Sequence, residues 1–438
     1  MRDLLLLLIV VASVPATFMA PFTGIVMWHW LSLMNPHRLT WGYAYDFRFA
    51  LIVAVTTIAA WLISRESKKL PNSAPVYWMA AFTIWITITL PFAHMADAAH
   101  DKWVAVIKVL GMTFVTLALV TTRERINWLV WVAVISLGFY GVKGGLFAAA
   151  TGGRGRVYGP PLSFIADNNA LAQALVMVLP LMRHVQVTAA QIWVRRGMWV
   201  AMGLTCLAVL ATYSRGGLLA LIVVLSLMWI RSRNKVLTAL ALVFIMVAAL
   251  PVLPEKWYGR MATIAEYDTD GSTLGRFQAW TFAYKVAVDR PLTGGGFRVF
   301  TDEKLYMAYI PEALRARNFH SIYFEVLGEN GFIGLILFLG LGISTLLLTW
   351  RIMRATRGRS ELSWANSLAA MIQVAVIGYA AAGTFQNFGF FDFYYTLIVL
   401  VVATWRVVQQ QMALAPAPAM PVASPTADGD SLPAPGRA

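Results

Sequence analysis

The sequence contains a single cysteine among its 438 residues, and this residue, Cys206, falls inside a long apolar run. A lone cysteine excludes an intrachain disulfide and a cysteine-based metal site. Charged residues are also scarce at 13%, whereas hydrophobic residues make up 59% of the chain and the mean hydropathy is +0.66. This balance indicates a protein that spans a membrane several times.

Apolar runs close to 20 residues long recur along the chain, and they are apolar on all sides, as helices in lipid must be. The short alternating segments of a transmembrane barrel are absent. We therefore predict an all-α polytopic membrane protein with about twelve crossings. The expected spans are 4–34, 48–64, 75–92, 102–120, 126–149, 168–184, 193–211, 215–231, 236–253, 331–350, 365–383 and 391–409.

The first of these spans is interrupted by Pro15, Pro21 and Gly24. It is either one broken, tilted helix or a pair of short helices. Its apolar run continues well beyond the hydrophobic region of a normal signal peptide, so we do not expect cleavage there.

Lysine and arginine gather in every second connection, around residues 65–69, 123–125, 183–196, 231–235 and 351–359. By the positive-inside rule these connections and both termini face the cytoplasm. Much of the net charge of +14 then reflects topology, so nucleic-acid binding is not needed to explain it. The predicted organisation is a bundle at 1–253, a large periplasmic loop at 254–330, the last helices at 331–409 and a disordered cytoplasmic tail at 410–438, rich in Ala, Pro and Ser.

Some basic residues break this charge rule, because they fall on the predicted outer face. They are Arg154, Arg156 and Arg215, and in the large loop Lys256, Arg260, Arg276, Lys285, Arg290, Arg298, Arg315 and Arg317. A long outer loop is exempt from the rule, so most can be ordinary surface residues.

Arg215 differs from the others, because it lies in a tight connection between two long apolar helices. Ser214 can cap the following helix, whose free N–H groups and dipole attract a phosphate. The arginine can hold such a phosphate with a fork of donors, or it can snorkel to lipid headgroups.

A candidate helix at 272–289 in the large loop carries Arg276. Phe277, Trp280, Tyr284 and Val288 share one face of this helix, which predicts that it lies along the outer membrane surface with Arg276 near the depth of a lipid diphosphate. The run Gly294 to Gly296 follows, and it fits a plain turn or a close approach to a ligand.

His320 precedes the next membrane helix, where an imidazole can take a proton from an attacking hydroxyl or can be structural. His94, Asp97 and Asp101 share a helical face at metal-ligand spacing. Their position in an exposed outer loop favours solvated side chains over a metal site.

Taken in order, these motifs resemble the O-antigen ligase and O-antigen polymerase superfamily. The resemblance rests on Ser214 to Gly217, Gly275-Arg276 with Trp280, Arg290-Pro291-Leu292, the glycine run, His320 to Tyr323, and Glu325 through Gly331. The segments 159–169 and 35–38 are most similar to the exosortase-associated O-glycosylation ligase branch.

The resemblance implies a GT-C-type glycosyltransferase of the bacterial inner membrane that works at the periplasmic face on an undecaprenyl diphosphate-linked glycan. Such ligases transfer the glycan to a hydroxyl of the lipid A core, and the family's essential residues match Arg215, Arg276 and His320. Arginine would then stabilise the diphosphate leaving group, so we expect neither a metal nor another cofactor. Candidate supporting residues are Arg154, Arg156, Arg290 and Tyr323.

Other functions remain open at this point. A polymerase would use a second lipid-linked glycan as acceptor, and a protein O-oligosaccharyltransferase would use a Ser or Thr side chain. Family members often have Asn after the histidine, so Ser321 leaves the acceptor class open. A transporter of lipid-linked sugars is disfavoured, because the polar residues gather at the outer face and not inside the spans.

Overall fold

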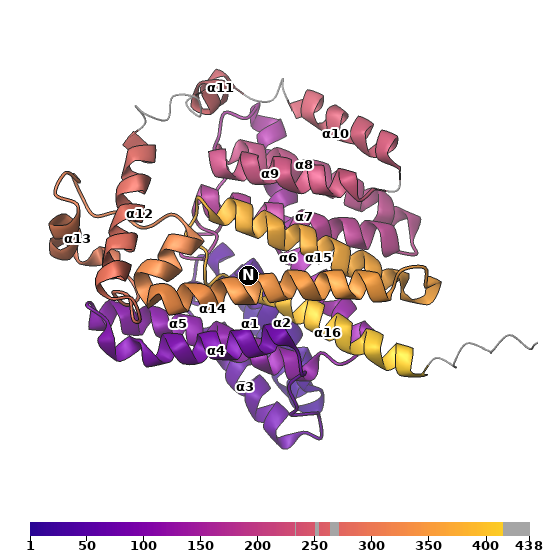
Figure 1. The fold of residues 1–438 in the computed structure, drawn as a ribbon. Coiled ribbons are helices and arrows are strands. Elements are labelled where there is room, and N and C mark those ends of the chain that lie inside the picture. The colour runs from indigo at the N-terminus through magenta and orange to yellow at the C-terminus, as the bar shows by residue number, and fades with distance from the viewer. Residues whose placement is uncertain (233, 250–253, 263–270, 415–438) are drawn as a thin grey trace, which may run out of the picture.

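The computed structural model describes residues 1–232, 234–249, 254–262 and 271–414, and these residues are helical with no strand among them. Figure 1 shows long helices running side by side as a bundle. Within the described ranges, nine helices are long and apolar enough to cross a membrane. The all-α polytopic membrane fold is therefore confirmed, whereas the count of about twelve crossings stays a prediction.

The helices of the bundle vary in length and in burial. Those long enough to cross a membrane are α1 (Arg2–Met19), α4 (Ala74–Ile88, continued by a 3₁₀ turn to Phe92), α5 (Ala96–Leu119), α6 (Arg123–Thr151), α7 (Asn168–Thr188), α8 (Ile192–Ala211), α14 (Ile322–Ala355), α15 (Ser363–Gly383, preceded by a 3₁₀ turn) and α16 (Asp392–Leu414). Shorter apolar helices are α2 (Pro21–Met34), α3 (Phe49–Ile63), α9 (Arg215–Ile230) and α10 (Lys235–Ala249). The most deeply buried is α7, which packs against α6, α8, α9 and α15.

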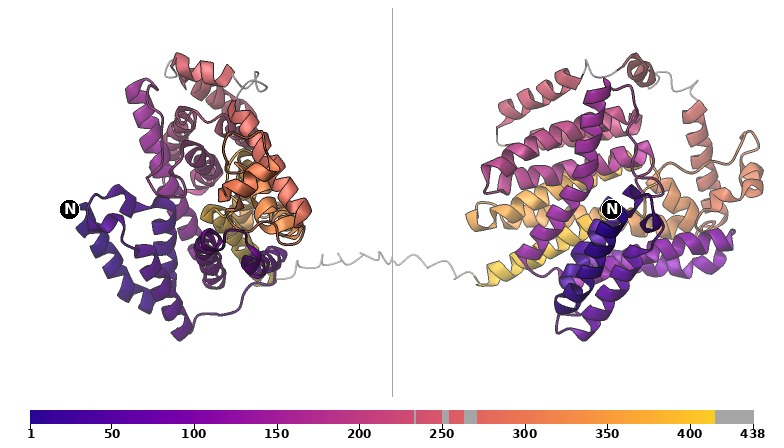
Figure 2. Two further views of the ribbon diagram at one scale, coloured as in Figure 1. Left: turned by 90° about the vertical axis from the view of Figure 1, so that its left-hand side faces the viewer. Right: turned by 180° about the vertical axis from the view of Figure 1, so that it is seen from behind.

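The first predicted span is a pair of helices, which settles the alternative that the sequence left open. The break falls at Ala20, whose backbone is extended at φ −144° and ψ 99°. The cause is Pro21, because proline disfavours the helical conformation of the residue before it and favours the first position of a new helix. Together α1, α2 and α3 pack to one side of the bundle, with α5 contributing to their core (Figure 2).

Helix α14 begins at Ile322, earlier than the span expected from 331, and it is kinked at Gly331, where φ is 69° and ψ is −172°. The kink frees backbone carbonyls of the preceding turn, and the glycine run supplies their donors. The Gly295 N–H donates to the Gly328 carbonyl at 2.8 Å, and the Gly296 N–H donates to the Glu329 carbonyl at 3.0 Å. In this structure the glycine run therefore approaches the protein's own backbone.

The described residues of the large loop include the α-helices α11 (Glu255–Ala262), α12 (Gly271–Asp289) and α13 (Glu303–Tyr309). Figure 1 shows α12 crossing one end of the bundle beside the start of α14. The predicted apolar face is largely exposed, since Phe277, Tyr284 and Val288 are each at least half accessible. Trp280 departs from this face, because its ring stacks on Phe324 with centroids 5.0 Å apart.

Some predictions concern residues outside the described ranges. These are the tail from 415 to 438 and the last residues of the span 236–253. Helix α16 extends to Leu414, past the predicted start of the tail at 410.

Candidate active site

Arg215 is the first residue of α9, and Ser214 caps this helix. The Ser214 hydroxyl accepts a hydrogen bond from the Gly217 N–H at 3.0 Å, so the predicted cap is confirmed. The connection is held against α7, because the Asn168 carboxamide donates to the Thr212 carbonyl at 2.8 Å. Tyr213 takes the left-handed conformation at φ 59°, which turns the chain sharply between α8 and α9. The start of α9 and the half-buried Arg215 are thus held in a fixed place.

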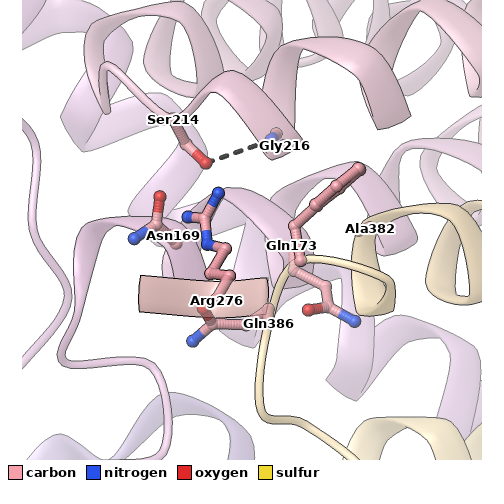
Figure 3. Close-up of a pocket in the computed structure, with 9 residues that line it drawn as sticks. Asn169, Gln173, Ser214, Gly216, Arg276, Ala382 and Gln386 are labelled. Carbon is pink, nitrogen blue, oxygen red and sulfur yellow. Dashed lines mark hydrogen bonds between the residues drawn. The ribbon is translucent and has the colours of Figure 1, made fainter. Parts of the chain in front are cut away.

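A narrow pocket opens at this capped helix start, with about 240 Å³ of empty space, its open mouth included. Figure 3 shows the Arg276 side chain of α12 reaching across the pocket toward Ser214 and Asn169. The pocket combines two kinds of anion-attracting group, the positive end of a helix and a guanidinium. Its lining comes from four helices and the loop after α15: Asn169, Gln173, Ser214, Gly216, Gly217, Arg276, Ala382, Phe385 and Gln386.

Two glutamines at this pocket have an unusual hydrogen-bonding state. Gln173 is 1% exposed and Gln386 is 9% exposed. Among the residues that the structure describes, the Oε1 atom of each has no hydrogen-bond partner. Buried polar atoms are nearly always paired, so these two oxygens are exceptions among the residues that surround the pocket.

His320 lies just before α14 with its backbone at φ 47°, a strained conformation for a residue with a side chain. Burial lowers the pKa of His320 from its ordinary value of 6.5, and the charges of Arg276 and Arg317 lower it further, whereas Asp167 and Glu325 oppose them. The imidazole is therefore neutral at pH 7 and has a free lone pair to accept a proton. The structure thus brings Arg276 into the electrostatic surroundings of His320.

Arg317 was predicted only as one of several outer arginines, yet it packs against the helix that carries Arg276. A Cβ placed on Gly275 would lie 2.4 Å from the Arg317 Nη1 atom. The glycine therefore leaves room for a second guanidinium beside Arg276. The only signal in the sequence is the dipeptide Gly275-Arg276 itself, and that signal does not name Arg317.

The four candidate supporting residues lie outside the pocket lining. Arg156 lies over the Tyr213 ring at 5.4 Å, and Arg154 is exposed. Arg290 donates to the Phe92 carbonyl at 2.6 Å, and the Tyr323 hydroxyl donates to the Ala380 carbonyl at 3.0 Å. In this structure Arg156, Arg290 and Tyr323 brace the elements around the site.

A buried charge cluster next to the site had no predicted role. Lys102 of α5 donates to Glu325 at 2.7 Å and to Glu329 at 2.7 Å, and the two carboxylates are 5% and 0% exposed. Backbone donors complete the cluster, since the Gly389 N–H binds Glu325 at 3.0 Å and the Arg298 N–H binds Glu329 at 2.9 Å. The available signal was the spacing of the two glutamates, four residues apart on one helical face.

Comparison with known proteins finds two matching segments of the chain. Residues 200–339 match a family model described as O-antigen ligase, and residues 1–190 match a family of unknown function. No curated protein matches the chain. The matched ligase segment contains Arg215, Arg276 and His320.

Proposed function

From its membership of the O-antigen ligase superfamily, which residues 200–339 carry, we propose that this chain transfers a glycan from undecaprenyl diphosphate to a hydroxyl of the lipid A core. The transfer takes place at the periplasmic face of the bacterial inner membrane. One observation carries the proposal: Arg276 lines the pocket at the capped start of α9 and also lies in the electrostatic surroundings of His320. Arg276 therefore connects the candidate anion-binding pocket with the neutral imidazole of His320.

The positive charges around this pocket suit the donor diphosphate. The positive end of the α9 dipole and the guanidinium of Arg276 attract phosphate oxygens, and Arg215 adds a charge at the same helix end. These groups bind the leaving diphosphate more tightly as its charge grows in the transition state, which is the condition for catalysis. In this proposal arginine supplies the positive charge that the leaving group needs.

His320 acts on the acceptor. The acceptor oxygen attacks the anomeric carbon of the donor sugar while His320 takes the hydroxyl proton. The bond between the anomeric carbon and the diphosphate oxygen breaks, and the electron pair leaves with the diphosphate. Attack from the face opposite the leaving group inverts the configuration. The lowered pKa of His320 keeps the imidazole neutral and able to accept this proton at pH 7.

Reconstitution with defined substrates tests the proposal. Purified protein is mixed with undecaprenyl diphosphate glycan and lipid A core in the presence of EDTA, and transfer is compared between wild type, His320→Ala and the exposed control Arg315→Ala. Transfer by wild type and the control, but not by His320→Ala, supports a metal-independent ligase. If wild type elongates lipid-linked glycan or modifies a protein acceptor instead, the chain is a polymerase or a protein O-oligosaccharyltransferase.

A further inference from the structure

A larger cavity, of about 550 Å³, lies at the other end of the bundle from the candidate active site. Helix α7 connects the two, because Asn169 at its start lines the active-site pocket whereas His184 and Thr188 near its end line this cavity. A helix of this length rises about 1.5 Å per residue, roughly the thickness of the hydrocarbon core. The cavity is therefore at the membrane boundary that the charge pattern predicts to be cytoplasmic.

Two opposite charges stand next to each other on the wall of this cavity. Arg123 and Glu124 form the first turn of α6, and both line the cavity. Neither forms an ion pair with a residue in the described part of the chain. The Arg123 guanidinium lies 5.0 Å from the centre of the Trp364 ring, so it is held over the cavity wall. The wall thus offers one cation and one anion to a ligand.

Trp364 gives a second, independent observation. It is 6% exposed, and its indole Nε1–H has no hydrogen-bond partner among the described residues. A buried N–H without a partner is costly, and an acceptor oxygen would remove that cost where the indole turns its N–H, which is covered in this structure, toward the cavity. The other buried polar group of the wall, His184, already contacts the Ser367 hydroxyl through Nδ1 at 3.1 Å. Arg123 and Trp364 are therefore the donors available for an anion.

We propose that this cavity binds a membrane phospholipid whose headgroup carries both a phosphate and a primary ammonium, as phosphatidylethanolamine does. The phosphate accepts hydrogen bonds from Arg123 and from the Trp364 indole, while the ammonium donates to Glu124. Apolar wall residues such as Val130 and Leu368 contact the glycerol end of the lipid. A volume of about 550 Å³ is in the range of sites that hold small ligands, so the headgroup fits.

Native mass spectrometry of the purified full-length protein tests this site. The protein is titrated with phosphatidylethanolamine, phosphatidylglycerol and phosphatidylcholine of identical acyl chains, and separately with inorganic phosphate. Wild type is expected to retain phosphatidylethanolamine about tenfold better than the other two lipids, the preference that one added charged hydrogen bond gives. Inorganic phosphate is expected to compete only weakly, because it has neither the ammonium nor the apolar contacts.

Three variants separate the parts of the headgroup. Glu124→Gln should abolish the preference for phosphatidylethanolamine over phosphatidylglycerol without lowering phosphatidylglycerol binding. Arg123→Gln should weaken both lipids, and Arg123→Lys should recover part of the loss. Trp364→Phe keeps an aromatic ring at this position but removes the N–H together with part of the indole, so both lipids should bind about fivefold to tenfold more weakly. Arg357→Gln, an exposed residue of the α14–α15 connection, is the matched control.

Each alternative result overturns the assignment. Equal retention of the three lipids, unchanged in Arg123→Gln, would mean ordinary boundary lipid. Tight binding of inorganic phosphate that displaces all three lipids would mean a site for a free phosphate. An unchanged lipid preference in Glu124→Gln would remove the ammonium contact. Monodisperse elution of every variant in gel filtration establishes that a loss of lipid is not a loss of fold.

Discussion

Replacement of Lys102 by methionine should destabilise the protein more than the loss of any surface ion pair. Lys102 is the single cation between two carboxylates, Glu325 and Glu329, so its removal leaves two like charges in a buried place. Methionine keeps the length and the apolar contacts of the lysine stem. The experiment therefore isolates the charge.

The size of the effect follows from burial and from the remaining donors. Breaking a buried ion pair by removing one partner costs about 3–5 kcal/mol, because the other charge stays buried without compensation. Each carboxylate keeps one backbone donor, Gly389 for Glu325 and Arg298 for Glu329, which favours the lower end of that range. Glu329→Gln should cost less than Lys102→Met, because it leaves Lys102 and Glu325 as a neutral pair.

The single cysteine provides the assay. Cys206 is 2% exposed, so a thiol reagent labels it only when the bundle opens. The protein is titrated in mixed micelles with a denaturing detergent, and the extent of labelling at each step reports the free energy of unfolding. The matched control is Glu66→Gln. It breaks the pair with Arg125, whose side chains are 27% and 22% exposed, and should cost no more than about 1 kcal/mol. A Lys102→Met protein as stable as the Glu66→Gln protein would refute the argument.

Three further outcomes are expected from the candidate site and its surroundings. Arg276→Ala and Arg215→Ala should each lower glycan transfer about 10²-fold to 10³-fold in the reconstituted assay, with little recovery in the lysine variants, because the fork of donors is lost. The rate of glycan transfer should fall at acidic pH with a midpoint below pH 6.5, because the pKa of His320 is lowered. Asp167→Asn should move this midpoint to lower pH, because Asp167 raises the pKa of His320. A shift of the midpoint to higher pH would contradict this argument. Gly331→Ala should lower the unfolding midpoint, because φ is 69° there and a Cβ would lie 2.5 Å from a backbone oxygen; an unchanged midpoint would show that the kink is not required.

Local signals in the sequence predicted much of the fold. The cap at Ser214 follows from the chemistry of a serine before a glycine-rich helix start, and the structure confirms it. The first span was predicted with interruptions at Pro15, Pro21 and Gly24, and the structure shows that the break falls before Pro21. The start of α14 was placed too late, because Gly331 was interpreted as the boundary of a span, whereas the structure uses it as a kink inside a longer helix.

The site was less accessible to such reasoning, because it depends on contacts between residues far apart in the chain. The hydrophobic runs place Lys102 at the start of one predicted span and Glu329 just before another, but they do not say that the two charges come together. The same limit applies to Arg317, whose place beside Gly275 is set by the path of the loop before His320. The three central site residues were identified through the resemblance, and their partners required the structure.

Glu325 belongs to both groups of charge and so connects them. It raises the pKa of His320 and also receives a hydrogen bond from Lys102 at 2.7 Å. The cluster of one lysine and two glutamates has a formal charge of −1. Arg276 and Arg317 are positively charged, and they lower the pKa of His320. The cluster lies outside the pocket lining, and through Glu325 it offsets part of the effect of the two guanidiniums on His320. The chain can therefore hold several positive charges near one imidazole and still leave that pocket able to attract a phosphate.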